Sequence, residues 1–451
     1  MTDSRFIFDK NKCVACEACV VACIIENGRQ QPGNWRNVLS SNPMKLPGIP
    51  LFNISMSCNH CQDAPCMENC PALAYSRSPL SGAVLHSADA CIGCRYCTWT
   101  CPYDAPSFDP LQGVVGKCDF CESRIRQQLV PACVNACPTG ALDFSFGDTG
   151  PDSGSTEGLP APPPSIHVPV ITHPSVIIRE LEKESGPRME MSLFEANGKS
   201  GEGDVSVRGD LPGPSTKHKH KISAASEWSL LLFSLIIPAM LALSLTDVVR
   251  DGGPAAKAAF MAAGILGAGL STLHLGRPLR AWRALLNVRK SWLSREIASF
   301  LLFLSAVCMD LFVVPLPKLL ILITGIALLV SMDMLYGPAQ IYKKNRADPF
   351  LASLVAISLY LLLSQMYTVF ILFMLARLAM VLLFKEERRS RRDIIFSRIR
   401  IAGMVLTLAC ILFHAAPPLT LLALVVVEVL GRALFFNSLD VPVPVLKNQA
   451  H

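Results

Sequence analysis

Charge and histidine are both scarce in this sequence. Asp, Glu, Lys and Arg make up 17% of its 451 residues, and it contains 9 histidines. Nothing in it resembles a nucleotide-binding loop or a hydrolytic triad, so neither nucleotide chemistry nor hydrolysis is expected. Only His274 and His414 lie in long apolar segments. We expect them near opposite membrane faces, where they could not ligate one haem as a pair. We also expect no nucleic-acid partner.

Cysteine, by contrast, is abundant and lies mostly at one end. Sixteen of the 18 cysteines fall between Cys13 and Cys137, in four groups of four. The first and third groups share one spacing: Cys13-x2-Cys16-x2-Cys19-x3-Cys23 and Cys91-x2-Cys94-x2-Cys97-x3-Cys101-Pro102. The second and fourth are Cys58-x2-Cys61-x4-Cys66-x3-Cys70-Pro71 and Cys118-x2-Cys121-x11-Cys133-x3-Cys137-Pro138.

This spacing predicts iron-sulfur clusters. Three thiolates on a tight loop can reach three corners of one cubane, while the fourth, which we expect to open a helix, points at a neighbouring cluster. The prediction is four [4Fe-4S] clusters with no ligand missing or left over. A disulfide framework suits a small secreted domain, but no signal peptide precedes Cys13. Structural zinc usually needs only two separated C-x2-C pairs. Several clusters in one domain suit conduction of single electrons.

The composition divides the sequence into three regions. Residues 1–150 hold the clusters. Residues 151–221 are rich in Pro, Gly and Ser and have too little apolar material to offset the entropy of ordering. We therefore predict a flexible linker there, with one short helix at about 175–184. Residues 222–451 are dominated by apolar runs and form the predicted membrane domain.

The apolar runs predict a multi-pass membrane protein. A span needs about 20 apolar residues to cross about 30 Å of hydrocarbon. The stretch 349–384 would be roughly 54 Å long as one helix, so we expect it to split near 364–368 into two spans. The remaining candidate spans are 227–246, 254–275, 296–315, 317–336, 401–416 and 418–436, which makes eight in total.

Charge distribution favours eight spans over seven. With eight, the basic segments 217–221, 277–295, 343–346 and 385–400 all fall on one side, and the other side keeps little beyond Arg250, Lys257 and Lys318. The positive-inside rule then predicts that the linker and the cluster domain face the cytoplasm of a prokaryotic cell, with the spans in its inner membrane. Binding of these basic loops to lipid headgroups would leave the topology unchanged.

Two ionisable residues suggest a quinol site. His274 ends the second span and Glu296 opens the third, both on the linker side. An imidazole and a carboxylate at an interface suit removal of two protons from a quinol. The alternative is that both are ordinary residues at helix ends.

Other polar residues in the spans are weaker candidates. They are Asp310, Asp333, Arg377, His414 and Glu428. We expect Arg377 to pair with a buried carboxylate as a structural contact. Cys308 and Cys410 stand alone in apolar segments and are expected to be small packing residues.

The residues around the cysteines resemble a known family. The sequence is similar to the four-cluster electron-transfer subunit of the dimethyl sulfoxide reductase type of molybdoenzyme at Asn59-His60-Cys61, Cys91-Ile-Gly-Cys94-Arg-Tyr-Cys97, Cys101-Pro102-Tyr103 and Lys117-Cys118-Asp119-x-Cys121. His274-Leu-Gly-x-Pro and Ser294-Arg-Glu296-Ile resemble that enzyme's quinol-oxidising membrane anchor. Two subunits that usually occur separately are thus expected to be fused. The expected fold is an α+β ferredoxin-like domain followed by an all-α integral membrane domain of about eight helices.

The resemblance implies how the cysteines share the clusters. It pairs the first group with the fourth and the second with the third. The implied ligand sets are cage A (Cys13, Cys16, Cys19, Cys137), cage B (Cys118, Cys121, Cys133, Cys23), cage C (Cys58, Cys61, Cys66, Cys101) and cage D (Cys91, Cys94, Cys97, Cys70). Related nitrate reductase subunits carry tryptophan at the position of Cys94 and hold a three-iron cluster; the cysteine here implies four cubanes.

The resemblance also implies a donor and a partner. It implies menaquinol as the electron donor near His274 and Glu296, and a separate molybdopterin-containing catalytic subunit that reduces dimethyl sulfoxide or a similar compound. The reverse direction stays open, in which a formate-, sulfur-compound- or hydrogen-oxidising complex reduces quinone through this protein. A membrane scaffold with structural clusters is a third alternative. The best known members of the family hold their cluster domains outside the cytoplasm, whereas the charge bias here favours the cytoplasmic face.

Overall fold

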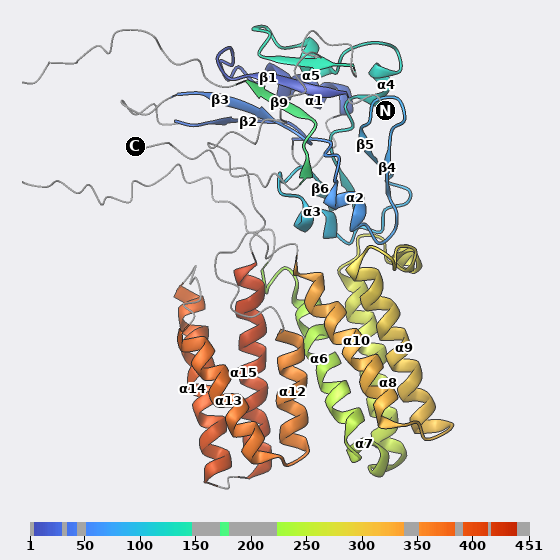
Figure 1. The fold of residues 1–451 in the computed structure, drawn as a ribbon, viewed down its shortest axis with the longest axis vertical. Coiled ribbons are helices and arrows are strands. Elements are labelled where there is room, and N and C mark those ends of the chain that lie inside the picture. Colours follow the sequence, from blue (N-terminus) through green and yellow to red (C-terminus); the bar gives the residue numbers. More distant parts are fainter. Residues whose placement is uncertain are drawn as a thin grey trace, which may run out of the picture.

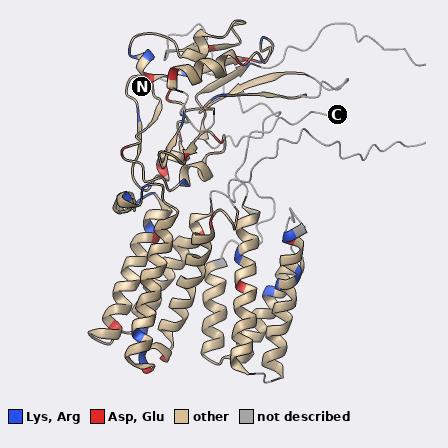
Figure 2. Cartoon of the chain, turned by 180° about the vertical axis from the view of Figure 1, so that it is seen from behind, with Lys and Arg blue, Asp and Glu red and all other residues tan. Residues whose placement is uncertain are grey.

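The structure of the protein is a computed structural model. It describes residues 4–28, 34–42, 51–146, 172–179, 223–337, 351–383, 391–413 and 416–439. A domain of short strands and helices lies at one end of a bundle of long helices (Figure 1). Figure 2 shows that charged residues are sparse along those helices.

The cysteine-rich domain is built from short paired strands. β1 (Arg5–Asp9) lies in a three-stranded sheet, antiparallel to β8 (Leu142–Ser145) and parallel to β9 (Val176–Arg179). Three antiparallel pairs accompany it: β2 (Asn37–Ser40) with β3 (Asn53–Met56), β4 (Tyr75–Arg77) with β5 (Val84–His86), and β6 (Ser107–Asp109) with β7 (Val114–Gly116). Phe6, Phe120 and Phe144 meet edge to face in the core.

Each cysteine group contributes its third cysteine to a short helix. Cys19, Cys66, Cys97 and Cys133 lie in α1 (Ala18–Asn27), α2 (Pro65–Glu68), α3 (Tyr96–Thr100) and α5 (Ala132–Asn135); α4 (Glu122–Ile125) precedes α5. The prediction that the fourth cysteine opens a helix is wrong. Cys23 lies within α1, Cys101 caps the end of α3, and the other two follow a helix. Prolines 71, 102 and 138 come next, and proline cannot continue a helix.

The short helix predicted at about 175–184 is also wrong. Its described part is the strand β9, which lies beside β1. The β-branched run Val176-Ile177-Ile178 favours a strand. The segment before β9 contacts the loop of the second cysteine group, where Gln62 N donates to His173 O at 2.9 Å and Tyr103 is hydrogen-bonded to Thr172 at 2.8 Å. Part of the predicted linker therefore belongs to the cysteine-rich domain; its remainder lies outside the described residues.

The predicted spans each overlap a helix. These are α6 (Trp228–Leu245), α8 (Gly253–Leu273), α9 (Trp292–Phe312), α10 (Lys318–Leu335), α12 (Leu351–Leu363), α13 (Tyr367–Leu383), α14 (Arg391–Leu412) and α15 (Pro417–Ser438). The long stretch does split, because α12 ends before Gln365, which has a φ of 57°. Within the described residues, five helices are long and apolar enough to cross a membrane: α6, α8, α10, α14 and α15.

The start of α14 differs from the sequence prediction. We expected a connection up to residue 400, but the helix begins at Arg391. Arginine is a good helix former, and polar side chains in the first half of α14 are buried. Arg400 is 1% exposed and Ser397 2%. His414 lies outside the described residues.

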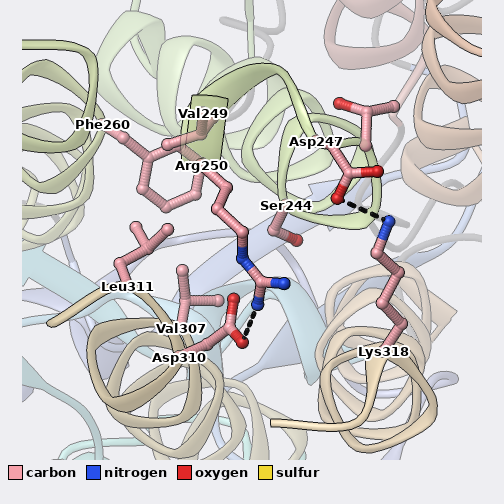
Figure 3. A pocket seen from close by; sticks show the side chains of 10 residues that line it. Ser244, Asp247, Val249, Arg250, Phe260, Val307, Asp310, Leu311 and Lys318 are labelled. Atoms are coloured by element: carbon pink, nitrogen blue, oxygen red, sulfur yellow. Dashed lines mark hydrogen bonds and ion pairs between the residues drawn. The ribbon is translucent and has the colours of Figure 1, made fainter. Parts of the chain in front are cut away.

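Ion pairs hold the helices at the end away from the cysteines. Arg250 of α7 (Val248–Asp251) pairs with Asp310 of α9, which also accepts a hydrogen bond from Leu316 N. Lys318 of α10 pairs with Asp247 at 2.9 Å. Figure 3 shows both pairs around one small polar pocket. Asp310 is thus satisfied by structural partners.

Another ion pair, in the other half of the bundle, is buried. Arg377 of α13 and Glu428 of α15 are 2% and 4% exposed and form a bidentate contact at 2.5 and 3.1 Å. The expectation that Arg377 pairs with a buried carboxylate is confirmed. Cys410 is buried, and Cys308 is partly buried.

Candidate iron-sulfur cages and their contact with the membrane helices

A left-handed residue recurs in all four cysteine loops. It stands two positions after the first cysteine of each group, at Ala15, His60, Gly93 and Phe120, with φ of 55°, 45°, 70° and 63°. Such turns point successive backbone N–H groups into a concavity that suits anionic iron-sulfur groups. A side chain other than glycine rarely adopts this conformation without a functional reason. The fourfold repeat therefore indicates one loop geometry used four times.

The thiols gather in four sets. In cage A, Cys13 interacts electrostatically with Cys19, Cys137 and Cys16. In cage B, Cys121 interacts with Cys133 and Cys23, and Cys118 interacts with Cys58 of cage C and with Cys133. Cys66 of cage C faces Cys101, Cys58 and Cys61; Cys97 of cage D faces Cys94, Cys70 and Cys91. Apart from Cys58 beside Cys118, each of these neighbours belongs to the same implied set, and the four ligand sets stay a prediction.

The donor set fits iron-sulfur clusters. Burial raises the pKa of the Cys23 thiol to about 11 and those of Cys61 and Cys121 to about 12. Buried thiolates need a compensating metal, and a coordinated thiol is deprotonated outright. Among the described residues, no three His, Cys, Asp or Glu side chains converge closely enough for a single metal ion. Backbone donors also reach sulfur, with Ala74 N at 3.3 Å from Cys70 Sγ and Gly93 N at 3.4 Å from Cys91 Sγ.

The four cages form a row. Cys118 of cage B is an electrostatic neighbour of Cys58 of cage C. Tyr75 lies between cages C and D, with Cys97 and Cys66 as its nearest thiols. Arg36 lies between cages A and B. Cage D therefore ends the row on the side of the long helices.

At one point of the contact between the cage D loop and the helical domain, the hydrogen bonds are made by backbone atoms alone. Gly276 N donates to Gly93 O at 3.2 Å, and Arg277 N donates to Ile92 O at 3.1 Å. A Cβ on Gly276 would come within 2.1 Å of Gly113 O, and one on Gly93 within 2.2 Å of the same oxygen. The segment that follows α8 therefore reaches the cage D loop only because these positions are glycine.

The basic connection between α8 and α9 binds the same surface. It contains the 3-10 helix η3 (Pro278–Leu285). Arg280 Nη1 donates to Cys91 O at 3.2 Å, and Asn287 Nδ2 donates to Cys70 O at 2.9 Å. Arg277 Nε donates to Gln112 O at 2.8 Å. The arginines of this loop therefore have protein acceptors beside cage D.

Glu296 lies in a buried polar cluster below cage D. It is 5% exposed, and its Oε2 has no hydrogen-bond partner among the described residues. Arg432 of α15 and Asp333 of α10 are its charged neighbours. Asp333 accepts hydrogen bonds from Ala352 N at 2.9 Å and Ser353 Oγ at 2.7 Å. An unpaired carboxylate oxygen beside a buried cation can accept a proton from a bound hydroxyl.

His274 has different surroundings from Glu296. It is the C-cap of α8, and its charged neighbour is Arg95 of the cage D loop. Arg95 also pairs with Glu227 at the start of α6, at 3.5 Å. The two predicted quinol residues thus lie on the same side of the helices, beside different partners.

Sequence reasoning missed several residues at this interface. Tyr96 OH donates to Leu335 O at 2.8 Å, and Trp99 stacks on Tyr336 at 6.2 Å between ring centroids. Arg432 is 1% exposed. A charge within the predicted span 418–436 was the signal that could have identified Arg432. The aromatic contacts depend on domain docking, which no local pattern reveals.

These features define an iron-sulfur protein carried on a helical membrane anchor. The model of the 4Fe-4S dicluster domain matches residues 50–148, and that of the DMSO reductase anchor subunit (DmsC) matches residues 226–414. An anaerobic dimethyl sulfoxide reductase subunit of Haemophilus influenzae is 34% identical over 188 residues, which cover 40% of this protein and 90% of the relative. The Escherichia coli subunit of the same name is 32% identical over 186 residues, 40% and 89% of the two proteins.

The protein belongs to the dimethyl sulfoxide reductase family, with the iron-sulfur subunit and the membrane anchor subunit joined in one polypeptide. Protein NrfC of Escherichia coli is also similar, with 36% identity over 140 residues, 31% of this protein and 63% of that one. Membership implies a catalytic subunit as partner and a membrane location.

Proposed function

We propose that the protein oxidises menaquinol in its membrane domain and passes the electrons to a separate molybdopterin-containing subunit, which reduces dimethyl sulfoxide or a similar small oxidised compound. The observation that carries this proposal is the row of four thiol cages, which begins at the membrane helices and leads away from them. Four [4Fe-4S] clusters, when bound, supply one-electron conduction along the row. The sixteen cysteines of cages A to D are the proposed ligands.

Quinol chemistry requires proton acceptors next to the electron acceptor. Oxidation of one quinol releases two electrons and two protons. Glu296 has an unpaired buried oxygen and lies near Tyr96 of the cage D helix. We assign it one proton. His274 is the proposed acceptor of the second, since an imidazole beside the cage D loop is the other titratable group of the anchor motif.

An apolar cavity suits the tail of a quinol. It has a volume of about 560 Å³ and lies between α6, α10 and α12, lined by side chains such as Leu241, Ile326 and Ile357. Ser353 is one of the lining residues and donates to Asp333, one of the two charged neighbours of Glu296. The cavity therefore starts beside the polar cluster and continues into the apolar helices, as a site for an amphipathic ligand requires.

The proposed topology has eight spans in a prokaryotic inner membrane, with the cluster domain on the cytoplasmic face. Arg277 and Arg280 of the connection 277–295 bind the cluster domain. The orientation consequently depends on the other basic connections, parts of which lie outside the described residues.

Metal content and reduction by quinol test this function. The full-length protein, reconstituted anaerobically, should hold about sixteen iron atoms and show interacting paramagnetic signals after reduction. A reduced menaquinol analogue should reduce the clusters. Iron near four or eight per folded molecule would contradict the four cages. Clusters that dithionite reduces but no quinol reduces would contradict the quinol site.

The direction of electron flow has its own test. A formate-, sulfur-compound- or hydrogen-oxidising partner would feed electrons from cage A toward quinone. Purification with the native partner identifies the class, since a partner that oxidises such a donor and reduces quinone through this protein would replace the first proposal by the second.

A further inference from the structure

Arg36 and Lys117 are buried inside the cluster domain, and within the described residues neither forms an ion pair or hydrogen bond with a carboxylate. Arg36 is 2% exposed and Lys117 3%. Within the described residues, the hydrogen bonds of Arg36 go to serine oxygens and those of Lys117 to backbone carbonyls. A buried charge is costly unless an opposite charge compensates it. Asp119 interacts electrostatically with Lys117, and the other acidic groups that act on the two cations are cysteine thiols.

Arg36 lies between cages A and B. Its Nη1 donates to Ser55 Oγ at 2.9 Å, and that hydroxyl lies 3.3 Å from Cys19 Sγ of cage A. Arg36 interacts electrostatically with Cys133, Cys118 and Cys23 of cage B and with Cys19 of cage A. Burial alone would lower the pKa of Arg36, but these thiols raise it above its ordinary value.

Lys117 has the equivalent position between cages B and C. Its Nζ donates to Val84 O and, at 2.9 Å, to Cys118 O. It interacts electrostatically with Cys58 and Cys66 of cage C, with Cys118 of cage B, and with Asp119. At the third junction, between cages C and D, stands the neutral Tyr75.

We propose that Arg36 and Lys117 are shared counter-ions, each of which stabilises the reduced state of the two clusters on either side of it. The inference rests on the cages proposed above. A cubane held by four thiolates is anionic and gains a further negative charge when it takes up one electron. A fixed cation in a low-dielectric interior favours the more negative state, and it does so for both neighbours. No bond forms or breaks in this step.

The test is a redox titration of the reconstituted full-length protein, followed by electron paramagnetic resonance. Signals are assigned with one Cys→Ser variant in each cage. In Lys117→Met, the equilibrium constant for reduction should fall about tenfold or more for the clusters of cages B and C, about 59 mV per factor of ten. The cluster of cage A should keep its potential. In Arg36→Met, cages A and B should shift, and cage D should not.

An exposed cation near a cage provides the matched control. Lys12 is next to Cys13, its side chain is 53% exposed, and it pairs with Asp9. Because water and salt screen it, Lys12→Met should leave all potentials unchanged. Loaded Lys117→Met and Arg36→Met proteins with unchanged potentials would overturn the counter-ion role.

Iron content separates this inference from the proposed function. If the unmodified protein holds fewer than four clusters, the result contradicts the four proposed cages rather than the proposed counter-ion role. If the neutral variants do not load iron, Lys117→Arg and Arg36→Lys decide. Loading restored by the charged replacements supports a counter-ion that the anionic cages need; continued loss of loading overturns the proposal in favour of a packing role.

Discussion

The proposed role of Glu296 as a proton acceptor can be tested directly by substitution. Glu296 is buried, one of its oxygens is unpaired among the described residues, and Arg432 faces it. Glu296→Gln keeps the shape of the residue and removes its ability to accept a proton. We expect quinol-dependent reduction of the clusters to fall about 100-fold. Stopped-flow absorbance with a reduced menaquinol analogue measures this rate.

Dithionite provides the internal control for that variant. It should still reduce every cluster to the normal extent, because dithionite donates electrons without needing a protein group that accepts the protons of a quinol. Glu68→Gln is a matched surface control, since Glu68 pairs with Lys290 and its side chain is 50% exposed. Normal quinol oxidation in Glu296→Gln would place the proton acceptor elsewhere, with Asp333 as the next candidate.

His274→Leu tests the second proposed acceptor separately. His274 and Glu296 have different charged neighbours, Arg95 for the histidine and Arg432 for the glutamate. If each takes one proton, the histidine variant should also lose most of the quinol-dependent rate while dithionite reduction persists. A normal rate would assign His274 to the contact between α8 and cage D. Membrane insertion should be unaffected, as judged by carbonate extraction.

The roles of residues with strict sequence spacing were predictable. The roles of residues that depend on contact between the cluster domain and the membrane helices were not. The four cysteine groups predicted which thiols could share a loop, since C-x2-C spacing acts locally. Tyr96 and Trp99 acquire their role only because α10 lies against α3. Arg36 gave no periodic or spacing signal, because the thiols it interacts with lie in distant loops. Lys117 stood in the motif before Cys118, but its interaction with Cys58 and Cys66 was not evident from the sequence.

At the scale of elements, the joint between α8 and the cage D loop decides electron entry. A Cβ on Gly276 would meet Gly113 O at 2.1 Å, so Gly276→Ala must push the two segments apart. Overpacking of this kind costs about 1–3 kcal/mol. We expect slower quinol-dependent reduction of the clusters and faster hydrogen exchange at residues 92–94 and 274–277. Mass spectrometry after deuterium labelling reports the exchange.

Gly269→Ala is the matched control for this joint. It changes a glycine in α8 itself, and a Cβ there meets nothing within 4 Å. Because alanine has the higher helix propensity, this variant should be neutral or slightly stabilising. Equal effects of the two substitutions would mean that the contact between α8 and cage D does not control the rate.

The cavity between α6, α10 and α12 predicts a dependence on tail length. Ile326 lines it and is 48% exposed. Ile326→Trp should fill the cavity and lower kcat/KM for a long-tailed quinol about 10-fold, while a short-tailed analogue loses little. Ile265→Trp on α8, 67% exposed and outside the cavity, is the control. Equal losses for both tails would show that the tail binds elsewhere.

Local propensity and tertiary contact compete in the elements that were mispredicted. Val176–Arg179 forms a strand because β1 offers a free edge beside it, a partner that the linker composition did not reveal. Arg391–Leu412 starts nine residues before the predicted connection ends, since buried positions such as Arg400 extend the helix. By contrast, the break near Gln365 followed from the length of the apolar stretch alone.

At the scale of the whole molecule, fusion of the two subunits fixes their geometry within one polypeptide. The cluster domain contacts the connection between α8 and α9, the start of α6 and the end of α10. These contacts lie around cage D. In the proposed function, cage D is the end of the row that receives electrons from the membrane domain. Separate subunits would have to find this arrangement by association, whereas the fused polypeptide holds its halves at a high effective concentration.

The same geometry sets the last prediction, which concerns topology. If the eight helices all cross, the polypeptide returns to the cluster side after α13 and again after α15. A reporter inserted at 385–390 and one fused after Asn437 should therefore report the same side as one placed in the linker, and a reporter between α9 and α10 should report the opposite side. Paired alkaline phosphatase and fluorescent protein fusions measure this. A reporter at 385–390 opposite to the linker would mean that α12 and α13 cross only once together, and all three on the external side would reverse the proposed orientation while keeping eight spans.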